Sequence, residues 1–177
     1  MSFLNVEIKA ICGNPQAIRD YLIQHNADFK GIDEQTDTYF NVVNGRLKLR
    51  EGRIENNLIF YERSNTAGPK NSQFELVKIS EAATLKEVLK RSLGIKTIIR
   101  KKREIYYIEN VKFHIDEVPG LGSFVEIEAG NILADLSEKT LRQQCEYYLK
   151  AFGISSNDLI DRSYSDMLLE KFAVSEE

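Results

Sequence analysis

Polar and apolar residues alternate strictly near the start of this chain, at residues 5–10. Successive side chains of a strand point to opposite faces, so Asn5, Glu7 and Lys9 share one face and the apolar residues between them share the other. We expect the apolar row, Val6, Ile8 and Ala10, to be buried. Residues 46–50 repeat the alternation, with basic side chains in the polar row and leucines in the apolar row.

The same pattern predicts eight strands. They are expected over residues 3–11, 29–43 with a break at Gly31, 46–50, 57–63, 73–79, 95–109, 111–118 and 123–129. The dipeptide Asn44-Gly45 is a strong hairpin signal, and it separates two of these strands. Residues 64–72, which include Gly68 and Pro69, are expected to form an exposed loop.

Four helices are expected between or after the strands. Asn14 and Pro15 begin the first, because Asn caps a helix and Pro suits its first position. Residues 84–93 form the second, with Thr84 and Glu87 as a capping box and a buried stripe of Leu85, Val88, Leu89 and Leu93. The third opens at Ser137, with Leu141, Cys145, Tyr148, Leu149 and Phe152 facing inward, and the last spans residues 163–172.

Hairpin signals outnumber crossover signals, which predicts an antiparallel α+β fold. The composition does not shift along the 177 residues, so we expect one domain over residues 1–177. The sequence shows neither a membrane-length apolar run nor a signal peptide, and we expect a cytoplasmic protein without a membrane partner. The net charge of -3 argues against a nucleic-acid binder. Cys12 and Cys145 are interpreted as packing residues.

The polar rows carry the candidate chemistry. Basic residues collect on some strands and acidic residues on others, as Lys101 with Arg103 and Glu126 with Glu128 illustrate. Two interpretations of these rows are open. They form either the solvated face of a half-exposed sheet or the inner face of a sheet curled around a ligand. Charges in such an interior would need partners, and a polyphosphate with divalent cations would supply them.

The motifs resemble those of one family over nearly the whole chain. Glu7-Ile8-Lys9, residues 45–50, residues 100–104, residues 114–128 and Arg162-Ser163-Tyr164 occur in the order seen in the CYTH superfamily, the triphosphate tunnel metalloenzymes. The Gly-Leu-Gly segment at 120–122 and the closing Arg-Ser-Tyr are most similar to the class IV adenylyl cyclase branch. The resemblance implies a closed antiparallel eight-stranded barrel, or tunnel, with flanking helices.

The resemblance also implies roles for residues at matching positions. Candidate ligands of one or two Mg²⁺ or Mn²⁺ ions are Glu7, Asp116, Glu126 and Glu128. Candidate phosphate-binding residues are Lys9, Lys48, Arg50, Arg63, Lys101 and Arg103. Tyr164 is a candidate at the tunnel mouth, although an aromatic residue on an amphipathic helix more often belongs to a core. His114 is expected to be structural, and Arg46, next to a turn, is expected to face solvent.

The family signature begins with Glu where this chain has Asn5, so the site loses one negative charge. The resemblance implies an enzyme acting on a nucleoside or inorganic triphosphate, most like an adenylyl cyclase that converts ATP to cyclic AMP and pyrophosphate. The alternatives are a triphosphatase that hydrolyses tripolyphosphate or thiamine triphosphate, and a noncatalytic polyphosphate or nucleotide binder. The residues identify no general base, and formation of a homodimer stays open.

Overall fold

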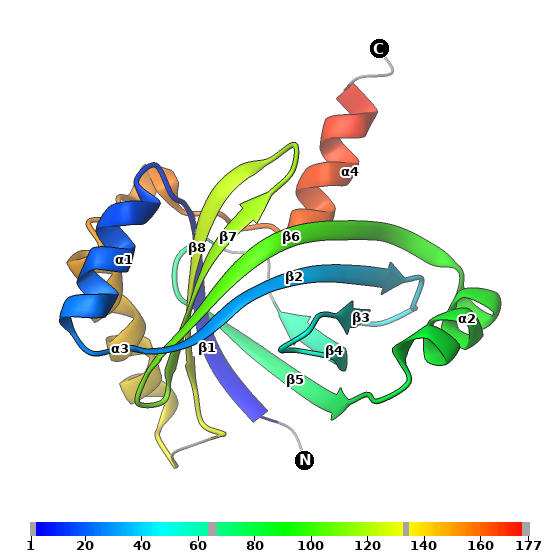
Figure 1. The fold of residues 1–177 in the computed structure, drawn as a ribbon, viewed down its shortest axis with the longest axis horizontal. Coiled ribbons are helices and arrows are strands. Elements are labelled where there is room, and N and C mark those ends of the chain that lie inside the picture. The colour runs from blue at the N-terminus through cyan, green and yellow to red at the C-terminus, as the bar shows by residue number, and fades with distance from the viewer. Residues whose placement is uncertain (1–2, 64–66, 133–134, 175–177) are drawn as a thin grey trace.

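The computed structural model describes residues 3–63, 67–132 and 135–174. Its centre is a closed antiparallel barrel with the strand order β1-β5-β4-β3-β2-β6-β7-β8, seen in Figure 1. The strands are β1 (Phe3–Ile11), β2 (Asp28–Phe40), β3 (Arg46–Glu51), β4 (Asn57–Arg63), β5 (Lys70–Lys78), β6 (Ile95–Ile108), β7 (Val111–Val118) and β8 (Gly122–Gly130). The predicted α+β class and the eight-stranded barrel are therefore confirmed.

Strand β1 closes the barrel by pairing with β5 on one side and β8 on the other. Its apolar row, Val6, Ile8 and Ala10, is almost fully buried, as expected. These residues point outward from the barrel into a core that contains Phe113, Ile115 and other apolar side chains of β7 and β8. The polar row of β1 consequently points into the barrel, and the same parity applies to the strands paired with it.

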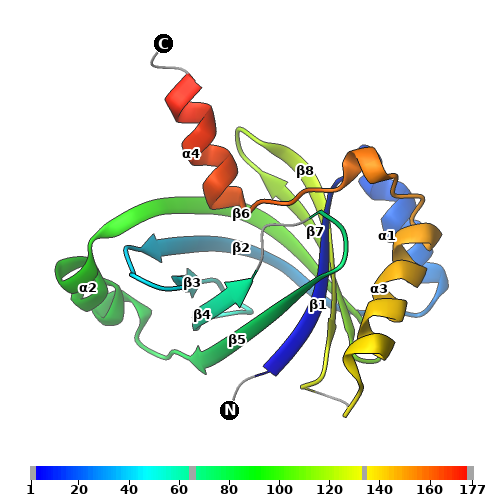
Figure 2. The same cartoon turned by 180° about the vertical axis from the view of Figure 1, so that it is seen from behind.

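Two helices complete that outer core. Helices α1 (Pro15–Gln24) and α3 (Glu138–Ala151) lie together against one side of the barrel in Figures 1 and 2. Leu22 of α1 and Leu141 and Cys145 of α3 are completely buried there. Cys12 and Cys145 are both free and buried, which fits the packing role predicted for them. Asn14 caps α1 and Ser137 caps α3 through side-chain oxygens, as predicted.

The second helix differs from the prediction. Helix α2 (Ala82–Leu93) begins two residues before Thr84, Glu81 caps it without a side-chain hydrogen bond, and the predicted capping box is wrong. The predicted apolar stripe is also not buried, since no residue of α2 is buried and Val88 is 57% exposed. The reason is position: α2 lies at the far end of the barrel from α1 and α3, where little covers it (Figure 1).

Two predicted strand boundaries differ from those in the structure. Residues Lys70–Ser72 belong to β5 instead of the predicted loop, because they pair with Glu7, Val6 and Asn5 of β1. Residues 64–66 of that predicted loop lie outside the described residues. The second strand ends at Phe40, three residues before its predicted end.

The last helix, α4 (Tyr164–Val174), projects away from the barrel beside β6 in both views (Figures 1 and 2). Its first turn is anchored, since Tyr164 and Ser165 are buried. A short 3₁₀ helix, Ser156–Asp158, lies between α3 and α4. Among the described residues, no helix combines the length and the apolar character that spanning a membrane requires.

Candidate functional site

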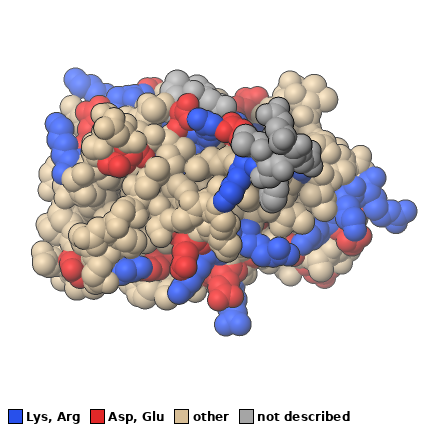
Figure 3. All heavy atoms as spheres, turned by 90° about the horizontal axis from the view of Figure 1, so that it is seen from above, with Lys and Arg blue, Asp and Glu red and all other residues tan. Residues whose placement is uncertain are grey.

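The inside of the barrel holds a cavity of about 690 Å³. The polar rows of the strands line it, so the solvated-face interpretation is wrong for them. The sequence-predicted residues among its lining are Glu7, Lys9, Lys48, Arg50, Lys101, Arg103, Glu126, Glu128 and Tyr164. The outer surface contrasts with this interior, because Figure 3 shows basic and acidic side chains interspersed over the face seen from above.

One part of the cavity is rich in carboxylates. We call it the carboxylate-rich side. Its cavity-lining residues are Glu7, Lys9, Arg103, Glu126 and Glu128, and the buried Asp116 and His114 contact Arg103 and Glu126 without lining the cavity themselves. Strands β1, β7 and β8 supply most of it, and β6 adds Arg103. The strand register brings these side chains together, since Glu7 pairs across the strands with Glu128, and Lys9 with Glu126. Carboxylates outnumber the cations Lys9 and Arg103 in this set.

Arg103 is the centre of the carboxylate-rich side. Its guanidinium donates to both oxygens of Asp116, from Nε at 2.7 Å and from Nη2 at 2.5 Å, and Nη2 also donates to Glu126 Oε2 at 2.9 Å. The Tyr164 hydroxyl donates to Asp116 Oδ2 at 2.8 Å. Burial alone would raise the pKa of Asp116, but Arg103 outweighs it and lowers that pKa. Asp116 therefore serves as a buried, ionised counter-ion to Arg103.

Glu126 is held from three directions. Lys9 Nζ lies 2.9 Å from Oε1, while Arg103 and the His114 ring nitrogen Nδ1, at 3.1 Å, contact Oε2. Burial disfavours the charged carboxylate, yet Lys9 and Arg103 hold the pKa of Glu126 well below its ordinary value. The Lys9 ammonium in turn lies 3.5 Å from the ring centroid of Tyr164, a cation–π contact. Tyr164 is thus both a core residue and part of the cavity wall.

The other part of the cavity is rich in cations. We call it the cation-rich side; it comprises Asp37, Lys48, Arg50, Glu55, Lys101 and Lys112. Asp37 is its buried hub. Arg50 donates to both of its oxygens, at 2.8 and 2.9 Å, and Lys101 Nζ lies 2.6 Å from Oδ2. Lys48 Nζ is more distant from the same oxygen, at 3.5 Å. One carboxylate thus holds three cations in place.

Lys101 lies among like charges on this side. Burial lowers its pKa, Arg103 and Arg50 lower it further, and the attraction of Asp37 only partly compensates, so that the pKa falls to about 7. Glu55, on the loop between β3 and β4, pairs with Arg50 at 2.8 Å and also with Lys112. The pKa of Glu55 stays well below its ordinary value because Lys112 and Arg50 outweigh the effect of burial.

Three predicted positions, Arg63, Arg46 and His114, differ from the cavity-lining residues. Arg63 belongs to β4, but its side chain lies outside what the structure describes, so its predicted role stays a prediction. Arg46 was expected to face solvent, but it is only 20% exposed and pairs with Asp166 of α4 at 3.1 Å. His114 is fully inside the barrel and contacts Glu126, with its Nε2 atom unpaired within the described part of the chain.

Charged residues of the cavity that the sequence reasoning missed include Asp37, Glu55 and Lys112. For Asp37 and Lys112 a signal was available, because each has inward strand parity: Asp37 pairs with Arg50, and Lys112 pairs with Glu128. Glu55 lies in a loop, where alternation gives no information. Its position depends on long-range contacts that only the fold reveals.

The carboxylate-rich side contains donors that fit a divalent cation. One donor atom each from His114, Glu126 and Glu128 lies within 4.8 Å of the others. Carboxylate oxygens suit Mg²⁺ and Mn²⁺, and the imidazole adds a nitrogen donor of the kind that transition metals accept. Asp116 fits a ligand role less well, because both of its oxygens already accept hydrogen bonds from Arg103. Asn5 lies in β1 opposite Gly130 and lines the same cavity, where its amide offers a neutral oxygen.

Comparison with known proteins places this geometry in context. A family model described as "CYTH domain" matches residues 4–164. A protein of Methanocaldococcus jannaschii named "Putative adenylate cyclase" is 29% identical over 175 residues, which cover 93% of this chain and 98% of the relative.

Solved structures share the fold. A conserved hypothetical protein from Pyrococcus furiosus has a TM-score of 0.77 and 26% identity, over 92% of this chain and 98% of its own. A protein from Hippeastrum, described as a "putative adenylyl cyclase" with a dominant triphosphatase activity, has a TM-score of 0.60 and 14% identity, over 97% of this chain and 96% of its own. At that identity, the second likeness concerns the fold alone.

Proposed function

The chain belongs to the CYTH domain family, and from this premise we propose that it is a divalent-metal-dependent enzyme acting on a triphosphate inside its barrel. The reaction we propose is that of an adenylyl cyclase, from ATP to cyclic AMP and pyrophosphate. The observation that carries the proposal is the separation of charge within one cavity. Carboxylates with an imidazole lie on one side and a surplus of cations on the other, as a metal–triphosphate complex requires.

The cation-rich side would hold the phosphates. Lys48 and Arg50 line the cavity from β3, and Lys101 lines it from β6, on the other side of β2. Their ammonium and guanidinium groups can donate charge-assisted hydrogen bonds to phosphate oxygens. Asp37 would keep these cations close together before the ligand arrives. This preorganisation reduces the entropic cost of ordering these side chains when the ligand binds.

The carboxylate-rich side would hold the metal. Glu126, Glu128 and Glu7, with His114, are the residues that we propose as its ligands or as ligands of its bound water. When bound, a divalent cation neutralises phosphate oxygens and so stabilises charge that develops in phosphoryl transfer. Lys9 and Arg103 would fix the orientation of Glu126, because each contacts one of its oxygens.

In the cyclase reaction the 3′-hydroxyl oxygen of ATP bonds to the α-phosphorus. The bond from that phosphorus to the oxygen bridging it to the β-phosphate breaks, pyrophosphate leaves, and the hydroxyl proton is released. The residues of this chain would position the triphosphate so that the hydroxyl and the leaving oxygen lie in line with the α-phosphorus.

Hydrolysis is the second candidate. The Hippeastrum protein that shares this fold is described as having a dominant triphosphatase activity. The same binding residues would then orient the terminal phosphate toward water. Product analysis after incubation with ATP, tripolyphosphate or thiamine triphosphate, each with Mg²⁺ or Mn²⁺, separates the two. Cyclic AMP with pyrophosphate identifies a cyclase, and release of inorganic phosphate identifies a triphosphatase.

A matched pair of variants tests whether either activity depends on the cavity. Glu128→Gln removes a proposed metal ligand, whereas Glu117→Gln removes an exposed carboxylate from the outer face of β7. We expect Glu128→Gln to lose the activity and Glu117→Gln to retain it. Binding of all three triphosphates without any product would instead support a noncatalytic binder.

A further inference from the structure

The loop of residues 52–56, between β3 and β4, places a carboxylate among the cations of the cavity. Glu55 Oε2 accepts a hydrogen bond from Arg50 Nη1 at 2.8 Å and another from Gln35 Nε2 at 2.9 Å. Its Oε1 atom pairs with Lys112 Nζ. The side chain is only 14% exposed. Glu55 therefore has both oxygens engaged by cations that face the cavity.

The two cations come from strands that are not neighbours in the barrel. Arg50 belongs to β3 and Lys112 to β7, and strands β2 and β6 lie between these strands in the barrel order. Glu55 thus joins side chains that the sheet itself does not bring together. A phosphate group between Arg50 and Lys112 would have to occupy the position that the Glu55 carboxylate already fills.

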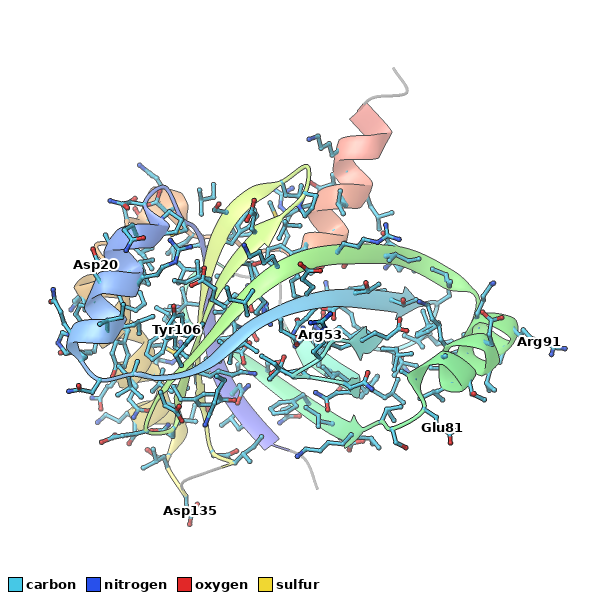
Figure 4. The ribbon with its side chains drawn as sticks, in the orientation of Figure 1. Asp20, Arg53, Glu81, Arg91, Tyr106 and Asp135 are labelled. Carbon is cyan, nitrogen blue, oxygen red and sulfur yellow. The ribbon has the colours of Figure 1, made fainter. Side chains whose placement is uncertain are left out.

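The loop does not depend on the Glu55 side chain for its shape. The buried Asp33 carboxylate accepts hydrogen bonds from the backbone N–H groups of Arg53, at 2.7 Å, Ile54, at 3.1 Å, and Glu55, at 3.0 Å. Arg53 marks this loop in Figure 4. The loop also packs closely around Gly52, where an added Cβ would lie 2.5 Å from Asp33 Oδ2. Asp33 thus holds the loop backbone through contacts that do not involve the Glu55 carboxylate.

We propose that Glu55 is an internal competitor for Arg50, a proposed phosphate-binding residue, and for the cavity cation Lys112, and that it is displaced when a triphosphate enters. This inference rests on the proposed function, since it assumes that the cavity binds a triphosphate. It assigns Glu55 a role in specificity: an anion must replace the contacts of a carboxylate already in place. A multiply charged terminal phosphate can do so, because it brings more charge to the same cations than one carboxylate does.

The test is metal-free binding of tripolyphosphate, measured by calorimetry, to the wild-type protein and two variants. Glu55→Gln removes the competing charge and keeps the side-chain size. The matched control is Glu51→Gln, at the end of β3 just before this loop, whose carboxylate pairs with Lys86 of α2 outside the cavity. Both variants change the net charge equally, so long-range electrostatics cancel in the comparison. Thermal unfolding of both variants verifies that they are folded.

Glu55→Gln is expected to bind tripolyphosphate about tenfold more tightly than the wild type, while Glu51→Gln changes the affinity by less than about twofold. Equal affinities for the two variants, or weaker binding by Glu55→Gln, would overturn the proposal and show that Glu55 only orders Arg50 and Lys112. That result would leave triphosphate binding by the wild type intact. Failure of the wild type and of both variants to bind would instead remove the proposed function as well.

Discussion

The two sides of the cavity contain the same types of charged residue in opposite proportions. On the carboxylate-rich side, acids outnumber cations. Arg103 pairs there with Asp116 and Glu126, and Lys9 pairs with Glu126. On the cation-rich side, bases outnumber acids. Asp37 pairs there with Lys48, Arg50 and Lys101, and Glu55 pairs with Arg50 and Lys112. One side thus has negative charge to offer a metal, and the other has positive charge to offer an anion.

The difference shows that a charged residue lining a cavity is not necessarily a ligand-binding residue. Arg103 is 2% exposed and its guanidinium donates to two carboxylates. Lys48 contacts Asp37 only at 3.5 Å and has a side chain that is 14% exposed. Both were expected to bind phosphate. The contacts favour Lys48 for direct binding and give Arg103 a mainly structural and positioning role.

Removing Arg103 should have the largest effect, and the effect should be on stability. Arg103→Ala leaves Asp116 and Glu126 as buried carboxylates without this partner, which costs about 3–5 kcal/mol in the free energy of unfolding. The matched control is Arg100→Ala on the same strand, an exposed residue whose loss should cost less than about 0.5 kcal/mol. Urea denaturation measures both. Similar small losses for the two variants would contradict a structural role for Arg103.

Lys101 should make anion binding depend on pH. Its pKa of about 7 means that the free protein carries a largely neutral Lys101 above that pH, whereas a bound phosphate favours the charged form. Binding should therefore take up a proton, and tripolyphosphate affinity should fall by up to about tenfold per pH unit between pH 7 and 9. Calorimetry in buffers of different ionisation enthalpy measures the proton uptake directly.

Lys101→Arg is the control for that titration, because arginine stays protonated over this pH range. The ligand titrates identically with both proteins, so the difference between them isolates Lys101. We expect the steeper pH dependence only in the wild type. Identical proton uptake by the two proteins would show that Lys101 is already charged in the free cavity, or does not contact the anion.

The sequence predicted much of the fold because alternation is a local signal. The parity of residues 5–10 correctly separated a buried outer row from an inward polar row. Helix α2 was misjudged for the opposite reason: its apolar stripe is a local pattern, but burial requires a partner, and α2 is positioned where little covers Val88. Periodicity indicates which face of a helix is apolar, and the tertiary structure decides whether that face is covered.

The candidate site was predictable to a similar extent. Strand residues such as Lys9, Lys48 and Glu126 were placed in the cavity by parity and by family resemblance together. Their pairings were not predictable, since Asp37 holds cations of β3 and β6 that are distant from it in sequence. The position of Glu55 could not be predicted from the sequence. Its loop is ordered by the Asp33 carboxylate, about twenty residues earlier, which accepts hydrogen bonds from the loop backbone, and such bonds leave no sequence pattern.

The proposed division of the cavity into an anion-binding and a metal-binding side is tested most directly by calorimetry. Tripolyphosphate is titrated into the wild type and two variants, first without metal and then with Mn²⁺. Lys48→Met on the cation-rich side should weaken binding by about ten- to a hundredfold, since it removes a charge-assisted contact worth roughly 1.5–3 kcal/mol. Glu128→Gln on the carboxylate-rich side should leave metal-free binding unchanged or tighter, and should lose the added affinity that Mn²⁺ gives the wild type. Weaker metal-free binding by Glu128→Gln together with unchanged binding by Lys48→Met would contradict the division.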